Sequence, residues 1–140
     1  VWQDQVLLCK RAIAPRQGYW TLPAGFLENS ETVAAGAARE TMEEANAQVS
    51  DLRLYTVFSL PHISQVYTFF RANLIGPKYS SGPESLEVAL FSEQDIPWDE
   101  LAFPVITQTL QHYFNDRKTD VFPTHYADLE FKRPVNPSAS

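Results

Sequence analysis

The chain has 140 residues and a formal net charge of −6, with a sequence pI near 4.9. This length is enough for one hydrophobic core, and the hydrophobic fraction of 44% is typical of a globular protein. The acidic balance disfavours nucleic acid as a partner, because the sequence has no basic stripe to neutralise phosphates. No apolar run is long enough for a membrane span and no signal-peptide pattern opens the chain, so we expect a cytoplasmic protein without a membrane partner.

Two strands are predicted first, near residues 4–11 and 18–22, from their apolar and β-branched side chains. Cys9 is the only cysteine, so no internal disulfide is expected, and its place in the first strand predicts a buried thiol. The chain begins with Val1 rather than Met and almost inside this strand, so we expect that a preceding segment was removed or not included.

A helix is predicted over residues 32–45, which are rich in helix formers, with Thr32 as its N-cap. At about 100° per residue, Glu40, Glu43 and Glu44 fall on one side of this helix. Three neighbouring carboxylates are favourable if a cation neutralises them, and ligands that are all oxygen favour Mg²⁺ or Mn²⁺ over zinc. Taken alone, the same cluster is also typical of a solvated acidic helix face.

The acidic helix is part of a longer pattern, G-x5-E-x7-R-E-x-x-E-E, which begins at Gly25 and includes Glu31 and Arg39. Residues 20–26 ahead of it read as a strand that enters a tight turn. In that turn Pro23 presets φ and Gly25 could take a positive φ. The joint occurrence of these residues favours a metal site over a solvated face.

This pattern resembles the signature of the Nudix hydrolases, which use divalent metal to cleave diphosphates linked to another moiety. The resemblance implies that Glu40, Glu43 and Glu44 bind the metal and that the carbonyl of Ala24 is a further ligand. Glu43 and Glu44 are therefore candidates for catalysis as well as for metal binding. The implied fold is of the α/β (α+β) class, a Nudix α/β/α sandwich with a mixed central sheet.

The other residues of the pattern are assigned to structure. The resemblance implies that Arg39 pairs with Glu31 and holds the loop of Gly25 to the helix, although Arg39 could instead pair with Glu43 one turn on. Asn46 stands where the family usually has Gly. Because Asn is the next-best residue for the left-handed conformation that ends a helix, we expect the same helix end here.

Further strands are predicted near residues 52–60, 65–74 and 86–91, and a second helix over 103–114. The expected organisation is a Nudix domain over residues 1–118, followed at 119–140 by a proline-containing tail or arm that packs on the domain or on a partner. A homodimer is possible.

Two glutamates outside the helix are candidates for the catalytic base or a further metal ligand. Glu84 and Glu87 follow a loop with two Gly-Pro breakers. Both could equally be exposed side chains at the entrance of a strand. Glu87 is slightly favoured because the following apolar strand would hold it more rigidly.

Three residues near the first turn are candidates for substrate binding. Arg11 and Arg16 flank the turn and could bind a phosphate, or could be surface charges. Trp20 could stack on adenine or flavin, or could be a core residue. Sequence runs around these residues resemble a Nudix subgroup of ADP-ribose or FAD pyrophosphatases. Members of that subgroup often carry a zinc ribbon ahead of the domain, which one cysteine cannot build here.

The leading functional hypothesis is metal-dependent hydrolysis of an ADP-linked nucleotide, ADP-ribose or FAD, to AMP and a second phosphate ester. Two alternatives remain. One is a Nudix enzyme for another nucleotide: a nucleoside triphosphate, a dinucleoside polyphosphate or NADH. The other is a nucleotide-sensing Nudix module without turnover. The NADH-cleaving group carries a Ser-Gln-Pro-Trp-Pro-Phe-Pro-x-Ser motif that this chain lacks.

Overall fold

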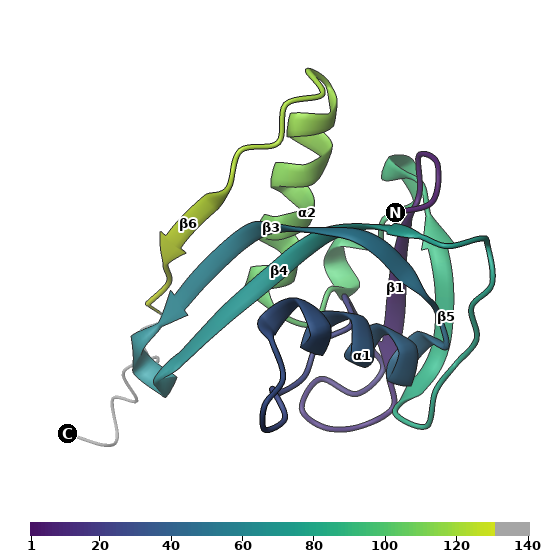
Figure 1. Ribbon diagram of the computed structural model, residues 1–140, viewed down its shortest axis with the longest axis horizontal. Helices are drawn as coiled ribbons and strands as arrows, with labels where there is room; N and C mark the ends of the chain where they lie inside the picture. Colours follow the sequence, from purple (N-terminus) through teal and green to yellow (C-terminus); the bar gives the residue numbers. More distant parts are fainter. Residues whose placement is uncertain (131–140) are drawn as a thin grey trace.

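The structure is a computed structural model that describes residues 1–130, and this part of the chain forms two helices, six strands and three 3-10 turns (Figure 1). The main elements are β1 (Val6–Arg11), β2 (Trp20–Thr21), α1 (Val33–Ala45), β3 (Val49–Leu60), β4 (Gln65–Leu74), β5 (Ser85–Phe91), α2 (Pro104–Arg117) and β6 (His125–Asp128). The 3-10 turns are η1 (Pro61–Ile63), η2 (Glu93–Asp95) and η3 (Trp98–Glu100). All five predicted strands and both predicted helices are present.

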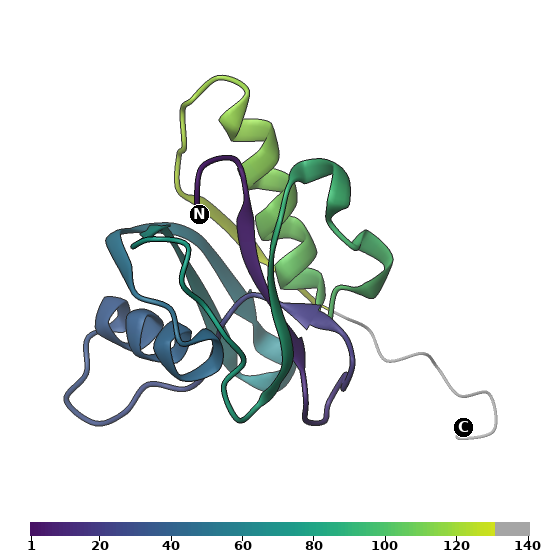
Figure 2. The same ribbon diagram turned by 90° about the vertical axis from the view of Figure 1, so that its right-hand side faces the viewer.

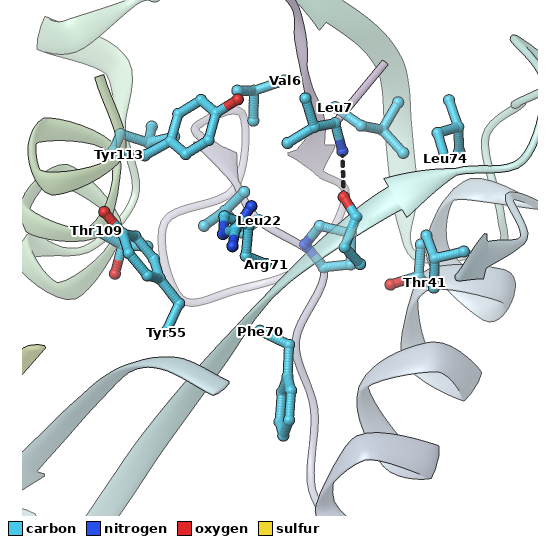
Figure 3. Close-up of a pocket in the computed structure, with 15 residues that line it drawn as sticks. Val6, Leu7, Leu22, Thr41, Tyr55, Phe70, Arg71, Leu74, Thr109 and Tyr113 are labelled. Atoms are coloured by element: carbon cyan, nitrogen blue, oxygen red, sulfur yellow. Dashed lines mark hydrogen bonds between the residues drawn. The ribbon is translucent and has the colours of Figure 1, made fainter. Parts of the chain in front are cut away.

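The strands form two three-stranded sheets. β1 lies between β2 and β5 and is antiparallel to both. β3 lies between β4 and β6, antiparallel to the first and parallel to the second. The fold class is the predicted one, but the expected single mixed sheet is divided. Apolar side chains of β1 and β4 line the same cavity, of about 120 Å³ (Figure 3).

The alternation of side chains along β1 places the two helices on opposite sides of the strands (Figure 2). Val6 and Leu8 belong to the main core with the buried apolar residues of α2. Leu7 and Cys9 point the other way and pack in a smaller cluster with Ala45 at the end of α1. Cys9 is buried as predicted, and its burial raises the pKa of the thiol to about 12.

The chain after α2 returns to the second sheet, where β6 adds as a parallel strand beside β3. A buried hydrogen-bond cluster fastens it: the Tyr55 hydroxyl donates to Asp116 Oδ2 at 2.5 Å, and His125 Nε2 lies 2.7 Å from the same oxygen. Residues 119–130, predicted as the start of a tail, thus pack on the domain. Residues 131–140 of the predicted tail lie outside the described residues.

Both ends of α1 match the sequence prediction. The Thr32 hydroxyl accepts a hydrogen bond from the Ala35 N–H at 3.0 Å and caps the first turn. Asn46 ends the helix in the left-handed conformation, at φ 47° and ψ 39°. Among residues 1–130, no helix is long and apolar enough to cross a membrane.

Candidate metal and catalytic site

One arginine side chain joins the loop before α1 to the helix. Arg39 donates hydrogen bonds to both carboxylate oxygens of Glu31, from Nε to Oε2 at 2.7 Å and from Nη2 to Oε1 at 3.1 Å. Its Nη2 also donates to the carbonyl of Phe26 at 3.0 Å. The hydrogen bonds from Arg39 hold the pKa of the Glu31 carboxyl below its ordinary value. Arg39 also donates to Glu43 at 3.0 Å, so the structure forms both of the pairings considered from the sequence.

Glu40 lies directly against the loop. Its Oε1 accepts a hydrogen bond from Arg39 Nη1 at 2.8 Å, and its side chain is 13% exposed. Gly25 faces this carboxylate so closely that a Cβ at residue 25 would overlap it. The expected positive φ at Gly25 is wrong, since the glycines with positive φ in the described chain are Gly18 and Gly76. Gly25 is needed here for the close approach of a carboxylate.

Glu44 is the most perturbed carboxylate of the helix. The Ala24 N–H donates to its Oε2 at 2.8 Å. Burial is the main cause that raises the pKa of Glu44 to about 8, and the negative charges of Glu40 and Glu84 add to it. The Ala24 hydrogen bond and the positive charge of Arg11 act in the opposite direction. A carboxyl that resists ionisation among other carboxylates is a group that a bound cation would stabilise.

The donor set fits a hard divalent cation, because the helix offers three carboxylates and every donor is oxygen. Within residues 1–130, however, no three Asp, Glu, His or Cys side chains converge on one point. Arg39 occupies oxygens of Glu40 and Glu43, and the Ala24 amide occupies Glu44. Ala24 thus contacts the carboxylates through its N–H, whereas the sequence analysis expected its carbonyl as a ligand. Because these carboxylate side chains do not converge, binding a metal here requires them to change conformation.

The structure separates the two glutamates proposed outside the helix. Glu84 lies in the turn before β5, and its charge acts on Glu44. Glu87 lies within β5, next to Val88, whose side chain packs in the cluster that contains Ala45 of α1. Because neighbouring side chains point to opposite faces of a strand, Glu87 points away from α1. The sequence slightly favoured Glu87 as the catalytic base or further metal ligand. Because Glu87 points away from α1, Glu84 is the better candidate for this role.

A family model described as the NUDIX domain matches residues 1–113. The chain belongs to the Nudix family. It is 55% identical to a solved NUDIX hydrolase from Nitrosomonas europaea, with a TM-score of 0.90 over 94% of this chain and 74% of that chain. An ADP-ribose pyrophosphatase from Streptococcus suis 89-1591 shares the fold, with a TM-score of 0.66 and 20% identity over 89% of this chain and 91% of that one.

Among curated proteins, the NAD-capped RNA hydrolase NudC from Salmonella paratyphi C (strain RKS4594) is 33% identical over 96 residues. This match covers 68% of the chain but only 37% of the length of NudC. Together with the solved hydrolase, these matches agree with the family model. Nudix hydrolases act on small nucleotide substrates and generally use divalent metal ions.

The three candidate substrate residues have different surroundings in this Nudix domain. Arg11 donates to a backbone carbonyl of its own turn at 2.7 Å, and its charge acts on Glu44. Arg16 donates to a carbonyl near the start of α2 and stacks over Tyr19 at 4.0 Å. Trp20 is 6% exposed and packs edge-on against Phe91, so it has the core position that was its alternative interpretation. The charge of Arg11 thus reaches a Nudix carboxylate.

A cleft of about 520 Å³ opens beside the Nudix helix. Its lining comes from three segments: loop residues 23–27, one side of α1 including Glu40, and residues 64–69 at the start of β4. Phe26 at its rim is 81% exposed. The sequence analysis missed this cleft, because segments far apart in the chain form it and no local motif marks their meeting.

Glu84→Gln is expected to lower kcat by roughly 100-fold, the lower range for loss of a general base. Glu87→Gln is expected to leave kcat within about twofold, because exposed substitutions away from a site have small effects. Steady-state hydrolysis by the two variants, with thermal unfolding as a check of folding, decides between them. A larger loss in Glu87→Gln than in Glu84→Gln would contradict this assignment.

Proposed function

We propose that the protein hydrolyses the diphosphate bond of an ADP-linked nucleotide, ADP-ribose or FAD, to give AMP and a second phosphate ester. The observation that carries this proposal is the cleft beside Glu40. Its lining contains the aromatic residues Phe26, Tyr67 and Phe69, and Glu40 is its only charged residue among those described. Such a lining suits an uncharged, planar ring next to a diphosphate, rather than a further phosphate group.

The proposed chemistry assigns a role to each candidate residue of the site. Mg²⁺ or Mn²⁺, held by Glu40, Glu43 and Glu44 with the carbonyl of Ala24, would offset the charge of the diphosphate. Glu84 takes the proton from the attacking water. Arg11, whose charge already acts on Glu44, contacts a phosphate oxygen.

A second candidate substrate is an NAD-type nucleotide, because the NudC proteins of Salmonella are among the relatives. Two observations weigh against it. The chain lacks the Ser-Gln-Pro-Trp-Pro-Phe-Pro-x-Ser motif of the NADH-cleaving group, and its net charge of −6 disfavours an RNA substrate.

A homodimer and a cytoplasmic location also remain proposals. The strand β4 lies at the edge of its sheet, and Val66 on it is 65% exposed. An exposed apolar edge strand is a surface on which a second copy could pair.

The experiment that tests the proposed function is release of AMP from a panel of nucleotides with Mg²⁺ or Mn²⁺. The panel contains ADP-ribose, FAD, NADH, diadenosine polyphosphates and nucleoside triphosphates, with Glu43→Gln as the control. We expect ADP-ribose or FAD to have the highest kcat/KM and the variant to lose the activity. If another compound of the panel is cleaved with the highest kcat/KM, the proposed Nudix chemistry stands and the proposed substrate is wrong. If the protein binds nucleotides but hydrolyses none of them, the nucleotide-sensing module is favoured.

A further inference from the structure

A loop far along the chain covers the end of the Nudix helix. The last carbonyls of a helix have no partners within it. Here loop 80–85 supplies the hydrogen-bond donors for two of these carbonyls. The Ser80 N–H donates to the Ala45 carbonyl at 2.8 Å, and the Gly82 N–H donates to the Glu44 carbonyl at 3.0 Å. The Ser85 hydroxyl donates to the same Glu44 carbonyl at 2.9 Å. The loop that carries Glu84 is thereby bonded to the backbone of a Nudix glutamate.

The contact is too close to admit a side chain on the loop. A Cβ at residue 82 would overlap the backbone carbonyl of Glu43. Gly82 lies two residues before Glu84, so a loop lifted off the helix at this point would carry Glu84 away as well. The distance between Glu84 and Glu44 is therefore set by how the loop sits on the helix end.

The side chain of Asn46, at the end of α1, forms hydrogen bonds to loop 80–85. Its side-chain amide donates to the Ser80 hydroxyl at 2.9 Å and to the carbonyls of Ser80 and Ser81 at 3.3 Å each. A glycine at this position could adopt the same left-handed backbone but could make none of these bonds. The side chain of Asn46 thus adds contacts that the helix end itself does not require.

We propose that Asn46 is a positioning residue, whose side-chain amide holds loop 80–85 on the end of α1 and so keeps Glu84 beside Glu44. The inference rests on the role proposed above for Glu84. It gives Asn46 a part in the reaction although it touches neither metal nor substrate.

Two substitutions test this role. Asn46→Gly keeps the backbone conformation without the amide, and Asn46→Asp keeps the size but replaces the donor with an acceptor. Both are expected to lower kcat by roughly tenfold with KM unchanged, because a small misplacement of a catalytic group is costly. In Asn46→Gly combined with Glu84→Gln, kcat should fall no further than in Glu84→Gln alone. Multiplicative losses in the double variant would refute a role that acts through Glu84.

Hydrogen exchange of the metal-free protein separates this proposal from the proposed function. The Ser80 and Gly82 amides should exchange faster in Asn46→Gly than in the wild type. The matched control is Asn73→Ala, which removes another exposed asparagine amide, bonded to Asp51 at 3.2 Å. Unchanged exchange in Asn46→Gly would overturn the positioning role, even if hydrolysis is confirmed. Faster exchange would support the hold on the loop, even if no tested nucleotide is cleaved.

Discussion

Glu44→Gln is expected to lower kcat by roughly 1000-fold, which is within the range for loss of one group that acts on the proton or the metal in a hydrolase site. The substitution removes the carboxylate that a bound metal would hold in its ionised form but leaves an oxygen that can accept the Ala24 hydrogen bond. Turnover of the best substrate with saturating Mn²⁺ measures the effect. Activity within tenfold of the wild type would place the essential carboxylates elsewhere.

The pH dependence of metal binding gives a second measurement of the same variant. Because the pKa of Glu44 is raised to about 8 and metal binds the ionised form, Mn²⁺ affinity of the wild type should rise with pH until about 8. In Glu44→Gln this dependence should be much weaker. Between the ordinary value of 4.5 and about 8, the folded metal-free protein binds more protons at Glu44 than the unfolded chain. The contribution of Glu44 to the unfolding free energy therefore falls as pH rises through this window.

Asp116→Ala is expected to lower the free energy of unfolding by about 2–4 kcal/mol, the usual range for breaking a buried hydrogen-bond network. Asp116 is 8% exposed and accepts from both Tyr55 and His125. Burial alone would raise the pKa of Asp116, but these two hydrogen bonds, together with the charges of His125 and His112, outweigh it and hold the pKa below its ordinary value. Urea denaturation at neutral pH measures the loss.

The matched control for this prediction is Asp99→Ala, at an exposed aspartate in η3. It is expected to change the unfolding free energy by less than about 0.5 kcal/mol. Asp116→Asn should lie between the two, because an amide oxygen still accepts from Tyr55. If Asp116→Ala is as stable as the Asp99→Ala control, β6 does not depend on this network.

The elements around the three glutamates of α1 were predictable because local rules determine them. Thr32 and Asn46 are cap residues whose preferences depend on neighbouring backbone alone, and both ends of α1 are where those preferences place them. The burial of Cys9 followed from its place in an apolar run. The carboxylates of the helix could be grouped from residue spacing alone, since a helix fixes the direction of each side chain.

What the sequence did not predict depends on contacts between distant segments. The short strand β6 has no apolar periodicity of its own and forms because β3 offers an edge and Asp116 holds His125. The need for glycine at Gly25 was correctly located but wrongly explained, because Glu40 approaches it from another element. Glu87 was preferred for its rigidity, yet rigidity within a strand also fixes which face it points to.

The hydrogen bonds of Arg39 to both the loop and the carboxylates place an internal cation at the Nudix glutamates. In the metal-free protein its guanidinium already neutralises part of the charge of Glu40 and Glu43. Each of these bonds uses one oxygen of its carboxylate, Oε1 of Glu40 and Oε2 of Glu43, so an arriving divalent ion can bind through the second oxygen. A metal bound there would share both carboxylates with Arg39, so its measured affinity would include the repulsion between the two cations.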